Sequence, residues 1–234
     1  MFSVIFEVFP RGERFDEYLA LAKQLRPTLE QMDGFIDIER FESRLRPGWI
    51  LSHSTWRDEK SLVRWRTLAE HHRAQQRGRD EIFADYHLRV GDVCADSDRA
   101  VDQQRYDATE VGAGTTVTLT EFTADDGADT PKPSDALSLV QAPADPSVVV
   151  DHDVFDSIYD PGKLAVLISW RTPTALADWR PATPAGYSAI RHRVVRVVRD
   201  YGMFDRREAP QYYPDAAGQD TRHAAPMGAV RSRC

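Results

Sequence analysis

Two adjacent histidines and a glutamine, His71, His72 and Gln75, are the side chains best suited to chemistry in the first third of the chain. On a helix, residues four positions apart share a face, so His71 and Gln75 are expected side by side. An imidazole exchanges protons near neutral pH and can act as a general base. Only one of the two histidines can point into a pocket beside the helix. The alternative is a surface pair without a chemical role.

Four more side chains could contribute to a site: Glu7, His53, Trp65 and Tyr86. A carboxyl group in an apolar pocket has a raised pKa and can transfer protons, which makes Glu7 a catalytic candidate. Alternatively, Glu7 makes a structural hydrogen bond or faces solvent. His53 lies on a predicted strand and faces either the pocket or the core. Trp65 could stack on a substrate ring or pack in the core, and Tyr86 could bind a substrate oxygen.

These residues belong to a chain that repeats itself. Residues 41–66 align with residues 155–180 without a gap, and nine of the 26 aligned positions are identical. Two of the five tryptophans recur at the same offset. Self-similarity at a fixed offset indicates a duplicated structural unit. We therefore predict two copies of one small domain.

The two copies differ at the candidate site. The offset of 114 residues pairs His71 with Ala185, so the second copy lacks the histidine. Glu7 recurs as Glu121, which favours a structural or solvent-facing position for that carboxylate. The sequence therefore predicts a site in the first copy alone.

Hydrophobic periodicity predicts the order strand, helix, strand, strand, helix, strand in the first copy. Pro27 should kink the first helix or split off its last turn, because proline lacks the amide hydrogen of the helical ladder. This order is typical of a ferredoxin-like fold, an antiparallel sheet with both helices on one face. The predicted strands are residues 2–9, 35–44, 49–56 and 86–90, and the predicted helices are residues 13–32 and 59–83.

The second copy keeps its predicted strands and loses most of its helices. Pro131 and Pro133 leave at most a short turn near residues 134–141, and Pro181 and Pro184 shorten the second helix. We divide the chain into a first domain, a polar linker, a degenerate second domain and a C-terminal strap with a disordered tail. These are residues 1–93, 94–114, 115–205 and 206–234.

A four-stranded sheet with helices on one face leaves its other face without cover. Two such sheets packed face to face would cover each other, and this one chain supplies both. We therefore expect an α+β fold in which two ferredoxin-like repeats form an intramolecular pseudo-dimeric barrel, as a monomer or as a homodimer.

Composition excludes several other classes. A net charge of −7 argues against a nucleic-acid partner, because binding phosphates requires a concentrated basic face. The first residues form a predicted strand rather than a signal peptide, and no apolar run approaches the roughly 20 residues that span a bilayer. We expect a cytoplasmic protein with a small-molecule partner. The sequence holds no phosphate loop, dinucleotide fingerprint, nucleophile elbow or metal-binding box, so neither a metal nor a cofactor is predicted.

Five short segments stand out in the first copy, together with Leu62 and Trp65. They are residues 34–36 (GFI), 54–59 (STWRDE), 70–75 (EHHRAQ), 77–79 (RGR) and 83–86 (FADY). With these segments, residues 1–93 resemble the antibiotic biosynthesis monooxygenase superfamily of dimeric α+β barrels. The resemblance implies a ferredoxin-like fold that pairs through its sheets, with a pocket between sheet and helices. It also favours His71 as the histidine that faces this pocket.

Characterised members of that superfamily include oxygenases that convert phenolic polyketides into quinones without a metal or organic cofactor. Our leading hypothesis is therefore a monooxygenase that oxidises an aromatic or polyphenolic metabolite with O₂ in the first-domain pocket. His71 would take the phenolic proton, and Trp65 would stack on the ring. The candidate substrate-binding residues are Gln75, Tyr86, His72 and His53.

Other members degrade heme, which leaves a heme-binding or heme-degrading protein as an alternative, with His71 as the iron ligand. In those members a tryptophan that matches Trp65 presses on the porphyrin. Glu7 stands where they carry an asparagine, and a carboxylate can only accept hydrogen bonds. A third alternative is a non-catalytic binding or scaffold module whose second half only completes the barrel.

Overall fold

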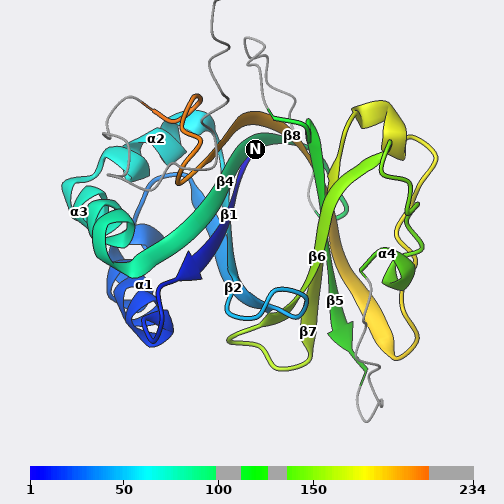
Figure 1. Cartoon of the computed structure of the whole chain (residues 1–234), viewed down its shortest axis with the longest axis horizontal. Coiled ribbons are helices and arrows are strands. Elements are labelled where there is room, and N and C mark those ends of the chain that lie inside the picture. Colours follow the sequence, from blue (N-terminus) through cyan, green and yellow to red (C-terminus); the bar gives the residue numbers. More distant parts are fainter. Residues whose placement is uncertain (99–111, 126–135, 211–234) are drawn as a thin grey trace, which may run out of the picture.

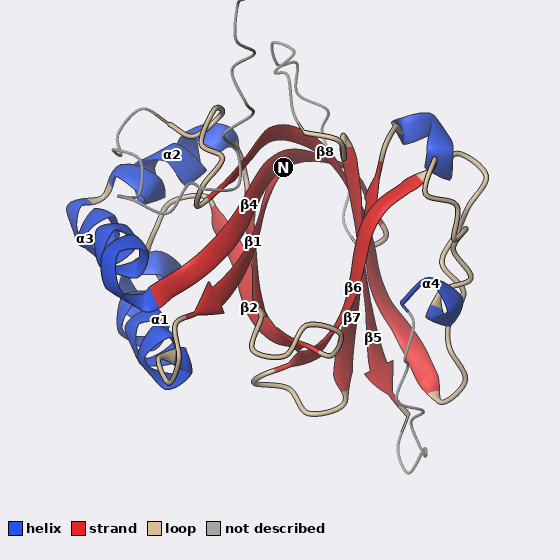
Figure 2. Ribbon diagram, viewed as in Figure 1, coloured by secondary structure: helices blue, strands red, loops and turns tan. Residues whose placement is uncertain are grey.

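Eight antiparallel strands close into one barrel in the computed structural model, and the helices lie outside it (Figures 1 and 2). The structure describes residues 1–98, 112–125 and 136–210. The strands of the first half are β1 (Phe2–Pro10), β2 (Phe35–Ser43), β3 (Ile50–Trp56) and β4 (Phe83–Asp96). Those of the second half are β5 (Thr116–Ala124), β6 (Val149–Ser157), β7 (Lys163–Trp170) and β8 (Tyr187–Gly202).

The strands follow the same order in the two halves of the barrel. In the first half the order is β4, β1, β3, β2, and in the second it is β8, β5, β7, β6. β2 pairs with β6, and β4 pairs with β8, so the two sheets join at their edges. The predicted α+β class and the predicted barrel are confirmed, and the two sheets close the barrel by pairing along their edges. Closure leaves no unpaired edge in the ring.

The last strand of the first half is longer than the hydrophobic pattern predicts. β4 has 14 residues, whereas the predicted strand covered residues 86–90. Arg89 and Asp92 interrupt the apolar pattern of β4, yet both side chains are buried. β4 therefore runs into the predicted linker, of which residues 99–111 lie outside the described residues.

Three helices cover the outer face of the first half: α1 (Phe15–Glu30), α2 (Glu59–Thr67) and α3 (Ala69–Arg77) (Figure 2). The predicted split of the first helix is wrong, since Pro27 lies inside α1. Pro27 is exposed, so the carbonyl group that it leaves without a helical partner can bind water. No helix among the described residues is both long and apolar enough to cross a membrane.

The predicted single helix 59–83 is in fact α2, α3 and a π-helical turn at Gly78–Ile82. Asp58 caps α2 by accepting a hydrogen bond from the amide of Ser61, at 2.8 Å. Leu68 then adopts an extended conformation (φ −61°, ψ 129°) and separates α2 from α3. This break changes the direction of the chain just before His71.

The described helices of the second half are short, whereas Pro131 and Pro133 lie outside the described residues. α4 spans only Ala136–Leu139, and a 3-10 turn spans Pro173–Leu176. Together with the surrounding loops, they pack on a buried cluster that includes Trp170.

Inside the barrel, an apolar layer lies next to a set of buried charges. Residues from matching positions of the two halves, such as Ile5 and Leu119 or Phe41 and Phe155, belong to one cluster. The other members are Met1, Leu51, Val93, Val117, Ala165, Leu167, Val195 and Val197.

Glu7 is the centre of one charge network in the barrel. Its carboxylate is 1% exposed and accepts hydrogen bonds from Arg46 and Arg89. Arg46 also donates to Asp153 of the second half, with 2.6 Å between Nε and Oδ2. Burial alone would raise the pKa of Glu7, but Arg89 and then Arg46 outweigh it and hold that pKa below its usual value. Glu7 is therefore ionised at neutral pH.

A second network repeats this arrangement in the other half. Glu121 accepts a hydrogen bond from Arg193 and pairs with Lys163, with 2.7 Å between Nζ and Oε2. Lys163 also binds Glu39 of the first half. Glu39 and Asp153 occupy matching positions at the offset of 114 residues. Each half thus contributes a carboxylate to the other half's network.

Replacement of Glu7 with glutamine should lower the free energy of unfolding by about 3 to 5 kcal/mol, because Arg89 would keep a buried charge without its counter-charge. Urea unfolding at pH 7, followed by tryptophan fluorescence, measures the change. Glu81→Gln is the matched control. Its carboxylate is 56% exposed, so loss of its ion pair with Arg77 should matter by less than about 1 kcal/mol. Equal losses in both variants would contradict a structural role for the buried charge.

Candidate active site

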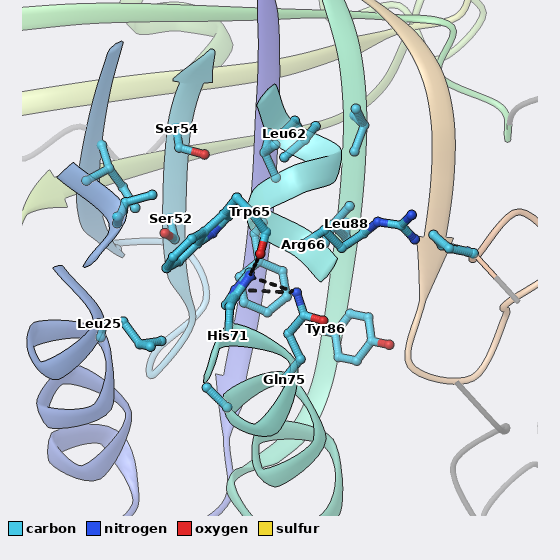
Figure 3. Close-up of a pocket in the computed structure, with 18 of the residues that line it drawn as sticks. Leu25, Ser52, Ser54, Leu62, Trp65, Arg66, His71, Gln75, Tyr86 and Leu88 are labelled. Atoms are coloured by element: carbon cyan, nitrogen blue, oxygen red, sulfur yellow. Dashed lines mark hydrogen bonds between the residues drawn. The ribbon is translucent and has the colours of Figure 1, made fainter. Parts of the chain in front are cut away.

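A cavity of about 340 Å³ lies between helices α1 to α3 and the outer face of the first sheet (Figure 3). Successive side chains of a strand point to opposite faces, so Phe6 and Ser52 face the cavity while their neighbours face the barrel interior. Its size and its mostly apolar walls are typical of small-molecule pockets. The main apolar lining residues are Val4, Phe6, Leu21, Leu25, Ile38, Leu62, Phe83 and Leu88.

Trp65, His71 and Gln75 form a cluster on the helical side of the cavity (Figure 3). The rings of Trp65 and His71 are stacked, with centroids 4.1 Å apart and planes at 17°. Nδ1 of His71 lies 3.0 Å from the carbonyl oxygen of Trp65. The amide nitrogen of Gln75 lies 3.1 Å from Nδ1 and 3.4 Å from Nε2. In an unbroken helix the Trp65 carbonyl would bond the amide of Ala69, so the break at Leu68 makes the contact with His71 possible.

The contacts of His71 define its protonation. A bond to the Trp65 carbonyl requires a proton on Nδ1, which leaves Nε2 as the acceptor of the neutral ring. Burial lowers the pKa of His71 to about 4, although the hydrogen bond to Trp65 acts in the opposite direction. His71 faces the cavity as predicted, but it is a weaker base than free imidazole.

Tyr86 lies on the cavity wall, and its hydroxyl accepts a hydrogen bond from Arg206. Burial raises the pKa of Tyr86, and the charge of Arg206 opposes that effect. The phenol is thus protonated at neutral pH and can donate to a ligand oxygen. Arg206 and Pro210 also line the cavity, so the described start of the predicted C-terminal strap helps to enclose it. Residues 211–234, with the predicted tail, lie outside the described residues.

Tyr18, Arg40 and Ser52 also line the cavity, although they were not among the predicted site residues. Arg40 of β2 pairs with Ser52 of β3, and Nε of Arg40 lies 3.4 Å from the hydroxyl of Tyr18 on α1. The alternation of side chains along β2 could have identified Arg40 as a lining residue. Arg40 continues the phase of Ile38, whose side chain faces the cavity.

Two predicted site residues lie on the other side of the sheet. Glu7 and His53 are outside the cavity because their strand positions point into the barrel. The pKa of Glu7 is lowered rather than raised, so the expected proton donor in an apolar pocket is wrong. His53 is 2% exposed, lies 2.8 Å from the hydroxyl of Ser3, and has a pKa that burial lowers to about 3. It is a core histidine rather than a substrate contact.

His72 does not line the cavity either, although it was predicted as a substrate contact. It follows His71 on α3 and therefore points to another face of that helix. Trp65 is 7% exposed and packs near Trp56, as expected of a core residue, and it also lines the cavity. Its stacking on a substrate ring stays a prediction.

The matching region of the second half is built for packing. Trp170 and Trp179 lie 5.0 Å apart, and Trp179 meets the ring of His192 edge-on at 5.9 Å. His192 in turn lies 2.9 Å from the hydroxyl of Thr120. The recurring tryptophans therefore have a structural explanation. In the described parts of the chain, no group of three histidine, cysteine, aspartate or glutamate side chains is placed to hold a metal ion.

The chain is similar to known monooxygenases. Residues 1–77 match the family model described as "Antibiotic biosynthesis monooxygenase". A "Jasmonate monooxygenase ABM" from Pyricularia oryzae is 46% identical over 226 residues, which cover 93% of this chain and 100% of that protein. Among solved structures, an antibiotic biosynthesis monooxygenase is 20% identical (TM-score 0.37; 41% of this chain, 100% of the other). An anthrone oxidase-like protein is 13% identical (TM-score 0.35; 86% of this chain, 92% of the other).

His71→Gln should make the stability of the protein less sensitive to acid. The unfolded chain protonates His71 below its ordinary pKa of 6.5, whereas the folded protein does so only near pH 4. The wild type therefore loses stability as the pH falls through this window. Between pH 7 and pH 5, the part due to His71 is about 1 to 2 kcal/mol, and the variant should not lose it. Urea unfolding at the two pH values tests this, and equal losses would contradict a buried neutral His71.

Proposed function

The chain belongs to the antibiotic biosynthesis monooxygenase family, and from this membership we propose that a small, mostly apolar substrate is oxidised with O₂ in the cavity of the first half. The family match spans residues 1–77, which supply most of the cavity lining. The protein is a monooxygenase, since its 46% identity extends over the whole of a curated monooxygenase. The alternative of a non-catalytic scaffold is therefore set aside.

The observation that carries the proposal is the cluster of Trp65, His71 and Gln75 at an apolar cavity. Nε2 of His71 would accept a proton from the substrate, Gln75 would hold an oxygen atom, and the Trp65 ring would fix the imidazole. Because burial lowers its pKa to about 4, His71 takes a proton more readily from an acidic donor. A substrate becomes more acidic as it gives up electron density to O₂, so proton transfer and oxidation would be coupled. The apolar walls would keep water from the reactive intermediate.

Jasmonate is the first candidate substrate, because it appears in the name of the relative with 46% identity. It is a non-aromatic cyclopentanone acid, whereas the sequence-based hypothesis was an aromatic or polyphenolic metabolite. Aromatic substrates stay a second candidate because part of the cavity wall is aromatic. There the ring of Phe6 lies 5.7 Å from both Phe83 and Tyr86, an arrangement that can pack against another ring.

The two substrate classes differ in the source of the electrons that reduce O₂. When a phenol becomes a quinone, the substrate itself releases the electrons and protons that convert the second oxygen atom to water. Hydroxylation of an alkyl C–H bond requires a further pair of electrons and two protons from an external reductant. We propose no resident cofactor, and a need for added reductant distinguishes the two classes.

A heme-based reaction fits this site poorly. The plane of an axial imidazole stands perpendicular to the porphyrin, and Trp65 lies at only 17° to the ring of His71. Trp65 would therefore meet the porphyrin edge-on and could not press on its face, as the resemblance to heme-degrading members had implied. Glu7 has no bearing on this alternative, because it lies inside the barrel.

Three features of the protein stay predictions. We expect the domains to be residues 1–93 and 115–205, joined by the linker 94–114. We expect the single chain to act as a pseudo-dimer, because both halves contribute to one closed barrel. We also expect a cytoplasmic location.

The purified protein should consume O₂ with jasmonate in the presence of a reductant such as ascorbate, and the product should gain one oxygen atom. An oxygen electrode and mass spectrometry measure both. His71→Ala should lower kcat by about a hundredfold or more, as loss of a positioned base does. His72→Ala is the matched control outside the cavity and should stay near the wild type. Turnover of hydroquinones or anthrones alone, without reductant, would shift the proposal to aromatic substrates. Unchanged activity of His71→Ala would remove His71 from the mechanism.

An absorbance titration with hemin tests the heme alternative separately. We expect no Soret band that depends on His71, because the Trp65 ring does not fit beside an axial ligand. A sharp band at one heme per chain that disappears in His71→Ala would contradict the proposal and make this a heme protein.

A further inference from the structure

Arg40 is a buried cation that faces the cavity. Arg40 is 8% exposed, because it lies on the strand face that the helices cover. Its only side-chain hydrogen bond to the described residues is to the neutral hydroxyl of Tyr18, at a long 3.4 Å. No carboxylate in the described parts of the chain lies within ion-pair distance of it.

The other buried cations of the barrel behave differently. Arg89 binds Glu7, Arg193 binds Glu121, and Arg191 binds Asp96 with 2.7 Å between Nη2 and Oδ2. A charge removed from water is unfavourable unless a counter-charge or several hydrogen bonds compensate it. Arg40 lacks this compensation within the described residues. An anion bound in the cavity would supply it.

The surroundings of Arg40 suit an anion. Its cross-strand neighbour Ser52 places a hydroxyl on the same cavity wall, and Tyr18 adds a second hydroxyl from α1. Glu59 is the only acidic residue among the described lining residues, against five arginines. The planar guanidinium fork of an arginine matches the two oxygens of a carboxylate.

We propose that Arg40, assisted by Ser52 and Tyr18, binds the carboxylate of an apolar acid, and that the substrates of this cavity are such acids. This inference deepens the proposed function and rests on it for the word substrate. The carboxylate would be held at β2 and β3, while His71 and Gln75 approach the rest of the molecule from α3. The anchored end thus differs from the reacting end, and the charge selects which part of the substrate meets the base.

The test is a binding measurement in the absence of O₂, so that no turnover takes place. Isothermal titration calorimetry compares jasmonate with its methyl ester, and decanoate with methyl decanoate as a pair of unrelated shape. The wild type should bind each acid about tenfold to a hundredfold more tightly than its ester, the usual effect of a charge-assisted hydrogen bond. Arg40→Met should remove this preference, and Arg40→Lys should keep part of it.

Arg26→Met is the matched control, because Arg26 is an exposed arginine of α1 outside the cavity, paired with Glu30. It should keep the preference for acids. Equal or absent binding of acid and ester by the wild type would overturn the proposal, and so would an unchanged preference in Arg40→Met. If Arg40→Met fails to fold by circular dichroism, the wild-type comparison and Arg40→Lys decide.

The result is independent of the proposed oxidation. A preference for acids without O₂ uptake would leave the Arg40 site standing and remove the proposed reaction. Uptake of O₂ with esters and acids alike would support the proposed reaction and remove the Arg40 site.

Discussion

Charges buried in the barrel must be paired, and two of the pairings require both halves of the chain. Arg46 connects Glu7 to Asp153 across the boundary between the halves, and Lys163 connects Glu121 to Glu39 in the same way. Neither half could close its interior alone without leaving a buried charge uncompensated. This explains why the second half has lost most of its helices and yet keeps its strands and its interior side chains.

Because the inner face of the ring is filled by this network and the apolar layer, a substrate site has to form on the outer face. Among the described residues, only the first half has long helices to cover that face, and they enclose the cavity (Figures 2 and 3). The second half covers the equivalent face with loops and the packed pair Trp170 and Trp179. The barrel therefore supplies one wall of the cavity, and the proposed active site lies on its first-half side.

Two irregularities give the cavity its chemical character. The extended conformation of Leu68 turns the chain between α2 and α3, so that His71 stacks on Trp65 and bonds its carbonyl. Burial then holds His71 neutral, with one nitrogen committed as a donor. Arg40 is the second irregularity, a charge in the apolar phase of β2. Inside the barrel such a charge meets a carboxylate, whereas here it meets a cavity.

The resemblance to the family implied a pocket that holds His71, Gln75, Trp65 and Tyr86. The sequence by itself determined the duplication, the strand order and the weak helices of the second half. These follow from local periodicity, proline positions and residue spacing. Only the tertiary structure decided that Glu7 and His53 face the interior, since a shift of one residue along a strand exchanges its faces. It also decided the edge-to-edge closure of the sheets, the helix break at Leu68 and the burial of Arg40. Each of these depends on contacts between segments far apart in the chain, which a local pattern does not record.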